Sequence, residues 1–599
     1  MKADLSNEKI ESFRGNIVPL YFDFPLKSNK LIKADIKWSA SGDAVEIREF
    51  SGESKENFNN GVLLLLKKPG RSSIKATFDG EEHVCEVVVS EPKSVSRECE
   101  LNYYLADMHD HTFYTHNHEE CFARQSEFQI DYINQLTDES LMDASVISDH
   151  AGVLNDIDFF RGFVADEQSE PKSVVILPGA ESEITYVITD RFGIKRRLSG
   201  EVVTLNAENY VPKKSWQEFE EAFSKTPEPI GIFAHPNITG FSTPGIWNFD
   251  FSHHNTEEMR RIMRGIELGS GEDKDECLIY EYAYSDALDA GFKVSPTCAS
   301  DSHGPIWGYH KIPGKTVIMA AEKSKEAFIY AIRNNRFYAT ESGNVKLHYT
   351  VNGKSAPCEL EPCGKYHFKV ELSSFKQDES TAPCICKLIS DGGKTVKVIE
   401  NIGSLFEFEV ESDTAHYFYL RLSDAFGRRT WSMPVFTGRR FEKKDDLILT
   451  PVVPAKFTAY DRITGKDAYE AIDGNPRNCW VSDNRLASIV IDMGECREIS
   501  ALGFSQRIVE HNLKDDWRST DYTAGFPFEY EIYSSDDGKT FEMCRNGVLR
   551  VFGSEEIIEL PKLKTRYLLF EVKSTVGSYS GFKKYEDSPV SIGNIAVFN

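Results

Sequence analysis

Five short apolar runs between residues 101 and 342 each end directly in a cluster of His, Asp or Glu. With their clusters they read "YYLADMHDH", "ASVISDH", "VVILPGAE", "IGIFAHP" and "VSPTCASDSH". They alternate with helix-period segments such as "SWQEFEEAFSK" and "SKEAFIYAIRNNRF", which is typical of an α/β domain with a mainly parallel sheet. Because the carboxyl ends of the strands in a β/α barrel meet on one face, the clusters are predicted to converge there.

The convergence predicts a multinuclear metal site. Seven side chains would share one cavity: His109, His111, His150, Glu181, His235, Asp301 and His303. Crowding them without a cation is unfavourable, because each buried carboxylate needs compensation and each buried imidazole needs a partner. Divalent metal ions meet both needs. The rings of a His-x-His pair on an extended strand end lie on one side, and a carboxylate such as Glu181 can bridge two ions.

Each cluster also has a plain structural interpretation. Asp149-His150 alone is typical of a capped turn, and His235-Pro236 alone is typical of an ordinary turn. Five such clusters in this order, each at a predicted strand end, favour the metal site over a set of unrelated turns.

Length, charge and cysteine spacing bound the remaining possibilities. At 599 residues the chain is expected to hold several domains of roughly 100–200 residues each. Its net charge of -25 argues against a nucleic-acid partner. The sequence has no run of eighteen apolar residues and no signal-like start, and its 12 cysteines are scattered. We therefore expect no membrane association and a cytoplasmic protein with reduced thiols, or a secreted one if a signal peptide is missing from this sequence.

The pattern of strands and turns predicts a multidomain chain. Residues 1–95 alternate apolar and polar positions between Gly and Pro turns, and resemble a bacterial immunoglobulin-like β-sandwich. Residues 101–342 form the predicted barrel, and residues 343–445 return to strands as a second β-sandwich module. After the proline-marked stretch "LTPVVPA", a further β-rich domain is expected over residues 455–599.

The motifs "DMHDHT", "SDH", "PGAE", "AHP" and "SDSH" resemble, in this order, those of the polymerase and histidinol phosphatase (PHP) family. The resemblance covers roughly residues 102–342. It implies a distorted seven-stranded β/α barrel that holds two or three Zn, Mn or Fe ions and hydrolyses phosphoesters.

The resemblance also implies the metal ligands. They are His109, His111, Glu181 and Asp301 for the first ion, Glu181 and His235 for the second, and His150 and His303 for the third. The third ion would take one more ligand from the following loop, which offers both His116 and His118. Relatives usually have a histidine before a "VVTLN"-like strand, where this chain has Glu201. A carboxylate there would favour harder ions such as Mn²⁺ over Zn²⁺ and would disfavour an anionic substrate.

Catalytic and substrate-binding roles follow from the same resemblance. Asp301 or His303 would relay protons, beside a water activated between ions that Glu181 bridges. Arg124 or the basic run that ends in Arg197 would bind the phosphate, although that run is equally typical of a solvated hairpin. His310 either lines the pocket or packs against it.

The phrases "AIDGNPRNCW" and "YEIYSSDDGKTF" make residues 455–599 similar to the discoidin, or coagulation-factor type C, family. That family is a jelly-roll sandwich that often binds sugars. In it the "DGN" turn often binds Ca²⁺, which here implies Asp473 and Asn475; an Asx turn closed by its own hydrogen bonds is the alternative.

Three functions are consistent with these patterns. The first is a metal-dependent phosphoesterase acting on a small phosphorylated molecule. The second is a metal-dependent hydrolase of glycans or glycoconjugates, with the discoidin-like domain as its sugar-binding module. The third is a non-catalytic glycan-binding protein whose metals are structural, and an open metal position would count against it.

Overall fold

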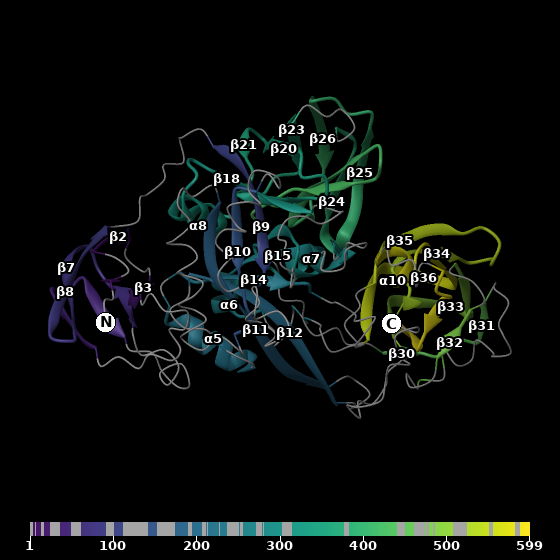
Figure 1. Ribbon diagram of the computed structural model, residues 1–599. Helices are drawn as coiled ribbons and strands as arrows, with labels where there is room; N and C mark the ends of the chain where they lie inside the picture. Colours follow the sequence, from purple (N-terminus) through teal and green to yellow (C-terminus); the bar gives the residue numbers. More distant parts are fainter. Residues whose placement is uncertain are drawn as a thin grey trace.

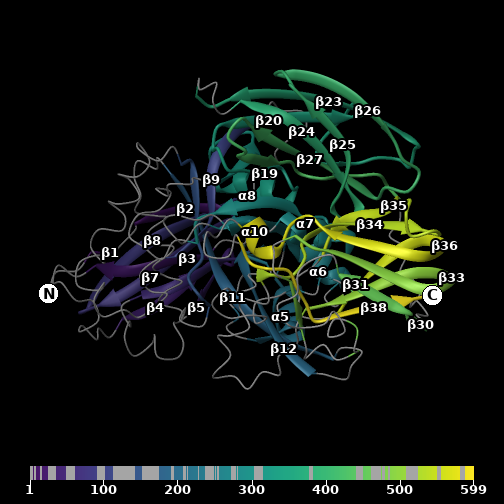
Figure 2. The same cartoon turned by 90° about the vertical axis from the view of Figure 1, so that its right-hand side faces the viewer.

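The computed structural model describes the following residues: 4–5, 8–13, 17–23, 36–48, 61–90, 101–111, 142–151, 174–189, 195–206, 211, 214–226, 228–236, 249, 251, 255–270, 278–279, 281–301, 314–376, 382–439, 450–459, 472, 474, 479–482, 486–506, 524–549, 555–580 and 587–599. Figure 1 shows the N-terminal strands (purple) and the C-terminal strands (yellow) on opposite sides of the central strands, and Figure 2 gives the same arrangement from the side. Within these ranges, none of the helices has both the length and the apolar composition that crossing a membrane requires.

The N-terminal module consists of two four-stranded sheets. One has the order β1 (Asp4–Leu5), β3 (Ile17–Asp23), β6 (Gly61–Leu66), β5 (Val45–Arg48), and the other β2 (Lys9–Phe13), β8 (Glu81–Ser90), β7 (Gly70–Phe78), β4 (Lys37–Ser41). Leu20 and Leu64 of the first sheet share a buried core with Ile74 and Val87 of the second. The two sheets therefore pack around one shared core.

The central strands close into a barrel. They include β9 (Asn102–Asp110), β10 (Ala144–Ile147), β11 (Val175–Thr189), β12 (Lys195–Leu205), β14 (Ile230–Ala234), β15 (Met263–Ser270), β17 (Ser295–Ala299), β18 (Lys315–Ala320) and β19 (Phe337–Thr340). Strands β9, β10 and β11 are parallel to one another, and so are β14, β15 and β17. Strand β12 is antiparallel to both β11 and β14. All six parallel strands therefore run in one direction, with their carboxyl ends at the same edge.

The barrel departs from regular β/α alternation at two strands. Strand β12 returns directly from β11, and β18 runs antiparallel to β9. A short connection permits the first reversal, because a parallel crossover needs a dozen or more residues whereas antiparallel neighbours can be joined by a tight hairpin. The expected β/α barrel is thus replaced, over the described ranges, by a mixed barrel with a parallel majority.

Helices cover the barrel where the sequence predicts them. The described α-helices are α5 (Trp216–Ser224), α6 (Glu257–Ile262), α7 (Glu281–Asp289), α8 (Lys325–Arg333) and α10 (Val576–Ser580). Helix α5 begins at a capping box in which Ser215 and Glu218 bond each other's backbone, and α8 buries Phe328 and Ile332 against the strands. The helix-period segment "SEFQIDYINQL" at residues 126–136 also predicts a helix, and it lies outside the described residues.

The third module is continuous with the barrel. One of its sheets contains β20 (Val345–Val351), β21 (Lys354–Ser355), β23 (Lys365–Ser374) and β26 (Leu405–Glu411). The remaining strands belong to the same closed hydrogen-bonded set as the barrel strands, and are β22 (Cys358–Glu359), β24 (Pro383–Ser390), β25 (Lys394–Glu400), β27 (Tyr417–Asp424), β28 (Arg429–Trp431) and β29 (Val435–Phe436). Strand β28 pairs with β19 of the barrel, and Glu341 accepts hydrogen bonds from the backbone N and Nε of Arg429 at 2.7 and 2.9 Å. The backbone hydrogen bonding therefore crosses the boundary predicted at residue 342.

The C-terminal strands form a large sheet and a small one. The large sheet contains β30 (Pro451–Val452), β31 (Lys456–Ala459), β33 (Ser488–Ser505), β34 (Glu529–Ser535), β35 (Glu542–Val548), β36 (Glu556–Val572) and β38 (Asn594–Phe598), and the small one β32 (Trp480–Val481) and β37 (Ser591–Ile592). Trp480, Phe504 and Phe570 are buried in the core. Tyr282 of α7 contacts Phe528 edge to face with ring centroids 5.2 Å apart, so this part packs against the barrel.

Two short strands and one 3₁₀ turn complete the assignment. They are β13 (Lys214–Ser215), β16 (Leu278–Ile279) and the 3₁₀ turn η3 (Asp391–Gly393), with β13 beside β11 and β16 beside β15. A further short pairing joins β22 to β29.

Candidate metal centre

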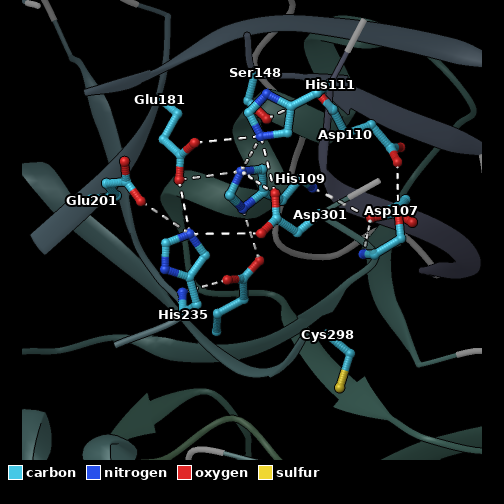
Figure 3. Close-up of polar contacts among 12 residues, drawn as sticks. Asp107, His109, Asp110, His111, Ser148, Glu181, Glu201, His235, Cys298 and Asp301 are labelled. Atoms are coloured by element: carbon cyan, nitrogen blue, oxygen red, sulfur yellow. Dashed lines mark hydrogen bonds and ion pairs between the residues drawn. The ribbon is translucent and has the colours of Figure 1, made fainter. Parts of the chain in front are cut away.

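The first two histidines lie at the end of strand β9, with His109 inside the strand and His111 directly after it. Side chains alternate along a strand, so His109 and His111 both point toward the barrel interior. Their rings are 0% and 1% exposed, and their Nε2 atoms lie 2.9 Å apart (Figure 3). Two imidazole nitrogens directed at each other inside a protein need a proton or a cation between them.

Glu181 of β11 lies at the centre of the site and contacts four histidines. Its Oε1 lies 3.3 Å from His109 Nε2 and 3.0 Å from His235 Nε2. Its Oε2 lies 3.4 Å from His111 Nε2 and 3.0 Å from His150 Nδ1. The parallel bridge between His150 and Glu181, directly after β10, brings the last contact about. A carboxylate that uses both oxygens in this way has the geometry of a bridging ligand.

His235 and Asp301 follow the ends of β14 and β17, and both have left-handed backbones. Their φ angles are 24° and 49°, a conformation that side-chain-bearing residues adopt at some cost and that is concentrated at functional sites. Asp301 Oδ1 lies 3.0 Å from His111 Nε2 and 3.4 Å from His109 Nε2, and its Oδ2 lies 3.8 Å from His235 Nε2. The Asp301 N–H donates to the His109 carbonyl at 2.8 Å, which joins the ends of β17 and β9.

Glu201 of β12 lies in the same cluster. Its Oε2 lies 3.4 Å from His235 Nε2 and its Oε1 lies 3.9 Å from His150 Nδ1. The register between β12 and its neighbours places it there, because Glu201 pairs with Ala234 at the end of β14. The antiparallel strand thus brings a carboxylate to the carboxyl ends of the parallel strands.

These residues form three groups that could hold metal ions. The groups are His109, His235 and Asp301; His109, His111 and Glu181; and His150, Glu181 and Glu201, with the ligand atoms of each group within 4.8 Å of one another. Glu181 Oε2 is buried and receives no hydrogen bond of good geometry from the described residues, although His150 Nδ1 is near. Imidazole nitrogens with carboxylate oxygens are a donor set that suits Zn²⁺, Mn²⁺ and Fe²⁺, so the residues fit the expected ions.

Two further carboxylates lie behind the ligands, and sequence reasoning missed both as members of the site. Glu267 of β15 contacts His109 Nδ1 at 3.1 Å. Asp107 Oδ1 accepts the backbone N–H of Ser300 at 2.9 Å and thereby ties β9 to the residue before Asp301. A lone acidic residue within an apolar strand, as in "GIELGS", was the available signal.

Asp110, on the opposite face of β9, belongs to a separate polar network. Its carboxylate oxygens lie 2.6 Å from the hydroxyls of Ser145 and Ser300. Burial, and next the neighbouring Asp107, raise the pKa of Asp110 well above its ordinary value. The side chain therefore connects three strands without entering any of the three ligand groups.

In the metal-free site the pKa values of three histidines, His109, His111 and His235, are raised. Burial by itself lowers the pKa of each ring, but the surrounding carboxylates, Glu181 and Asp301 above all, outweigh it. The pKa of His111 is raised to about 9 and that of His235 to about 10, and the pKa of His109 is raised well above its ordinary value. Metal binding needs neutral imidazoles and must therefore displace protons.

The carboxylates divide into two classes. Burial favours their neutral forms, yet the histidines outweigh it at Glu181 and Asp301 and hold the pKa of both below the ordinary value. At Glu201, burial and then the charges of Glu181 and Asp301 raise the pKa well above the ordinary value. Ionisation of Glu201 is therefore disfavoured in the metal-free site, and a cation beside it would favour the ionised form.

Metal binding at pH 7 is expected to release at least two protons, one from His111 and one from His235, because pKa values of about 9 and about 10 keep both rings charged there. Because binding releases these protons, a higher pH favours the metal-bound state. The affinity for the metal ion should therefore rise by about a hundredfold per pH unit between pH 6 and 8. Calorimetric titration with Mn²⁺ in two buffers of different ionisation enthalpy measures the proton number. An affinity independent of pH would contradict the expectation.

Several predicted site residues lie outside the described residues. They are His116, His118, Arg124, His303, His310, Asp473 and Asn475. The backbone of Arg197 lies in β12, four residues before Glu201 and opposite Val187. At about 3.3 Å per residue its Cα is roughly 13 Å from that of Glu201. The predicted phosphate contact by Arg197 therefore starts from a distant backbone position.

No family model and no curated protein matches this chain. Solved structures that resemble part of it are discoidin-like carbohydrate-binding modules. A family 32 module from Clostridium perfringens, in complex with GalNAc-β-1,3-galactose, is 21% identical and covers 24% of this chain and 94% of that one, with a TM-score of 0.19. The family 32 module of C. perfringens NanJ, in complex with galactose, is 18% identical over 24% of this chain and 93% of that one, also with a TM-score of 0.19. A chitosan-binding module from Paenibacillus sp. IK-5 is 16% identical over 25% and 97%, again at 0.19.

Proposed function

We propose that this protein is a metal-dependent hydrolase, with a phosphoester as its first candidate substrate. The observation that carries the proposal is the sharing of ligands: His109 and Glu181 each belong to two of the three possible metal groups. Shared ligands place two or three ions a few ångströms apart, as in two-metal hydrolytic sites. The PHP-like order of the motifs in the sequence supports the phosphoester.

The chain's own residues would divide the work. His109, His111, His150, His235, Glu181, Glu201 and Asp301 would hold the ions. Bound divalent ions supply a lowered pKa for an attacking water and offset negative charge on the substrate. Asp301, which would also help to hold an ion, is the first candidate for proton transfer. His303 is the second candidate for proton transfer, and Arg124 and Arg197 are the candidates for binding the phosphate.

The test is metal content together with turnover. We expect elemental mass spectrometry of the purified full chain to find two or three transition-metal ions per molecule. Phosphomonoester and phosphodiester substrates should then be hydrolysed. The matched control is protein stripped of metal by a chelator, which should be inactive and should regain activity when Mn²⁺ or Zn²⁺ is restored. Absence of metal after reconstitution with both ions would exclude hydrolysis by this site.

The second candidate is hydrolysis of a glycan or glycoconjugate by the same site. It rests on the discoidin resemblance of residues 455–599 in the sequence. Galactose and GalNAc-β-1,3-galactose, the ligands named for two of the similar modules, provide the sugars for a parallel screen. Stoichiometric metal with turnover of glycosidic or acyl bonds and none of phosphoesters would favour this candidate. Metal and sugar binding without any turnover would favour the non-catalytic glycan-binding protein.

A further inference from the structure

Glu267 is a buried carboxylate beside the ligands that belongs to none of the three groups. It lies in β15, is 1% exposed, and pairs across to Thr297 of β17. Its two oxygens contact two different candidate ligands. Oε1 lies 3.1 Å from His109 Nδ1, and Oε2 accepts the backbone N–H of His235 in a short hydrogen bond.

The contact with His109 determines which ring nitrogen is free for a metal. A neutral imidazole carries one N–H, and a carboxylate can only accept. Glu267 therefore holds the proton on Nδ1 and leaves the Nε2 lone pair directed toward His111, Glu181 and Asp301, which lie 2.9 to 3.4 Å from it. A carboxylate in this position also makes the imidazole a stronger donor to a cation.

The contact with His235 acts on the backbone. The φ angle of His235 is 24°, so its conformation is strained and needs compensating contacts. The hydrogen bond from the His235 N–H to Glu267 Oε2 is such a compensating contact, made by the strained residue itself. The same residue directs its Nε2 to Glu181 Oε1 at 3.0 Å. A contact that fixes the His235 backbone therefore also fixes the direction of its imidazole ring.

We infer that Glu267 is a positioning residue that presents His109 and His235 together to one metal ion, in the group that Asp301 completes. The inference rests on the proposed function in so far as it needs an ion at this group. Both histidines belong to that same group, so a single side chain sets the direction of two of its three ligands. Of the two groups that contain Glu181, only the one with His109 and His111 includes a residue that Glu267 contacts.

Glutamine at this position separates the two contacts. An amide has one accepting oxygen and one donating nitrogen, so it can accept from His109 Nδ1 or from the His235 N–H but not from both. The histidine N–H that does not meet the amide oxygen then faces the amide NH₂ group, which is also a donor. Glu267→Gln should therefore disturb one ligand while keeping the size of the side chain.

The experiment is titration of the metal-free full chain with Co²⁺ alone, followed by its visible absorption. We expect Glu267→Gln to bind Co²⁺ about 10- to 100-fold more weakly than wild type, with an altered ligand-field spectrum. The control is Glu281→Gln, since Glu281 is also buried but pairs with Arg421 at 2.7 Å and belongs to none of the three ligand groups. That variant should keep the wild-type Co²⁺ affinity and spectrum even where it lowers the unfolding midpoint.

The outcomes separate this inference from the proposed function. Wild-type affinity and spectrum in Glu267→Gln would overturn the inference, and so would wild type that binds no Co²⁺. Weaker binding in the variant, with no hydrolysis of any substrate by wild type, would uphold the inference and refute the hydrolase. Glu267→Gln could also destabilise the metal-free chain. In that case the Co²⁺ affinity of His109→Ala is compared with and without Glu267→Gln. A combined loss of affinity smaller than the sum of the two single losses supports positioning through His109, with the His235 contact accounting for the remainder, and fully additive losses refute the joint presentation.

Discussion

Replacing Glu181 by glutamine is expected to lower hydrolysis by about a thousandfold and to remove at least one metal ion per chain. Glu181 lies within 3.0 to 3.4 Å of four histidines and belongs to two of the three ligand groups. Glutamine keeps the shape but removes the negative charge and one of the two ligand oxygens. A metal ion contributes several kcal/mol to charge stabilisation, and about 4 kcal/mol corresponds to a thousandfold.

The measurement is turnover of the best phosphoester together with metal content for Glu181→Gln and wild type. Glu341→Gln is the matched control, because Glu341 is also a buried glutamate but pairs with Arg429 at 2.9 Å. It should retain its metal and lose activity only as far as it loses stability. Full metal content with undiminished turnover in Glu181→Gln would refute a bridging role for this carboxylate.

His109→Ala should have an effect of similar size for a different reason. It removes a ligand from two groups at once, and it leaves Glu267 Oε1 and Glu181 Oε1 without the ring that contacts them. We expect hydrolysis to fall by about a thousandfold and the unfolding midpoint of the metal-loaded protein to fall toward that of the metal-free protein.

The readouts are metal content, turnover and the unfolding midpoint with and without Mn²⁺. His348→Ala is the matched control, since His348 lies on β20 with a side chain that is 41% exposed and contacts Glu371 rather than a ligand. It should behave as wild type in all three. If His109→Ala keeps its full metal content and a Mn²⁺-dependent midpoint, His109 is not a shared ligand.

The strands that carry the site could be predicted from the sequence because their patterns are local. Apolar runs such as "IGIFA" and "SPTCA" became strands in which every residue is buried, and the polar residue after each run lies at the strand end. The antiparallel insertion of β12 and the pairing of β28 with β19 could not be predicted in this way. Strand direction and neighbours depend on contacts between residues that are far apart in the sequence, as in Ala339 opposite Trp431.

The sequence by itself determined which residue types stand at the strand ends, among them His109, Glu181 and Asp301, because side-chain alternation and turn chemistry act over a few residues. Only the tertiary structure decided which atoms meet. The contacts of Glu181 with His109 and His235, and the double contact of Glu267, depend on the register among β9, β11, β14 and β15. That register is set by the packing of the whole barrel, since a shift of one residue would turn each of these side chains to the opposite face.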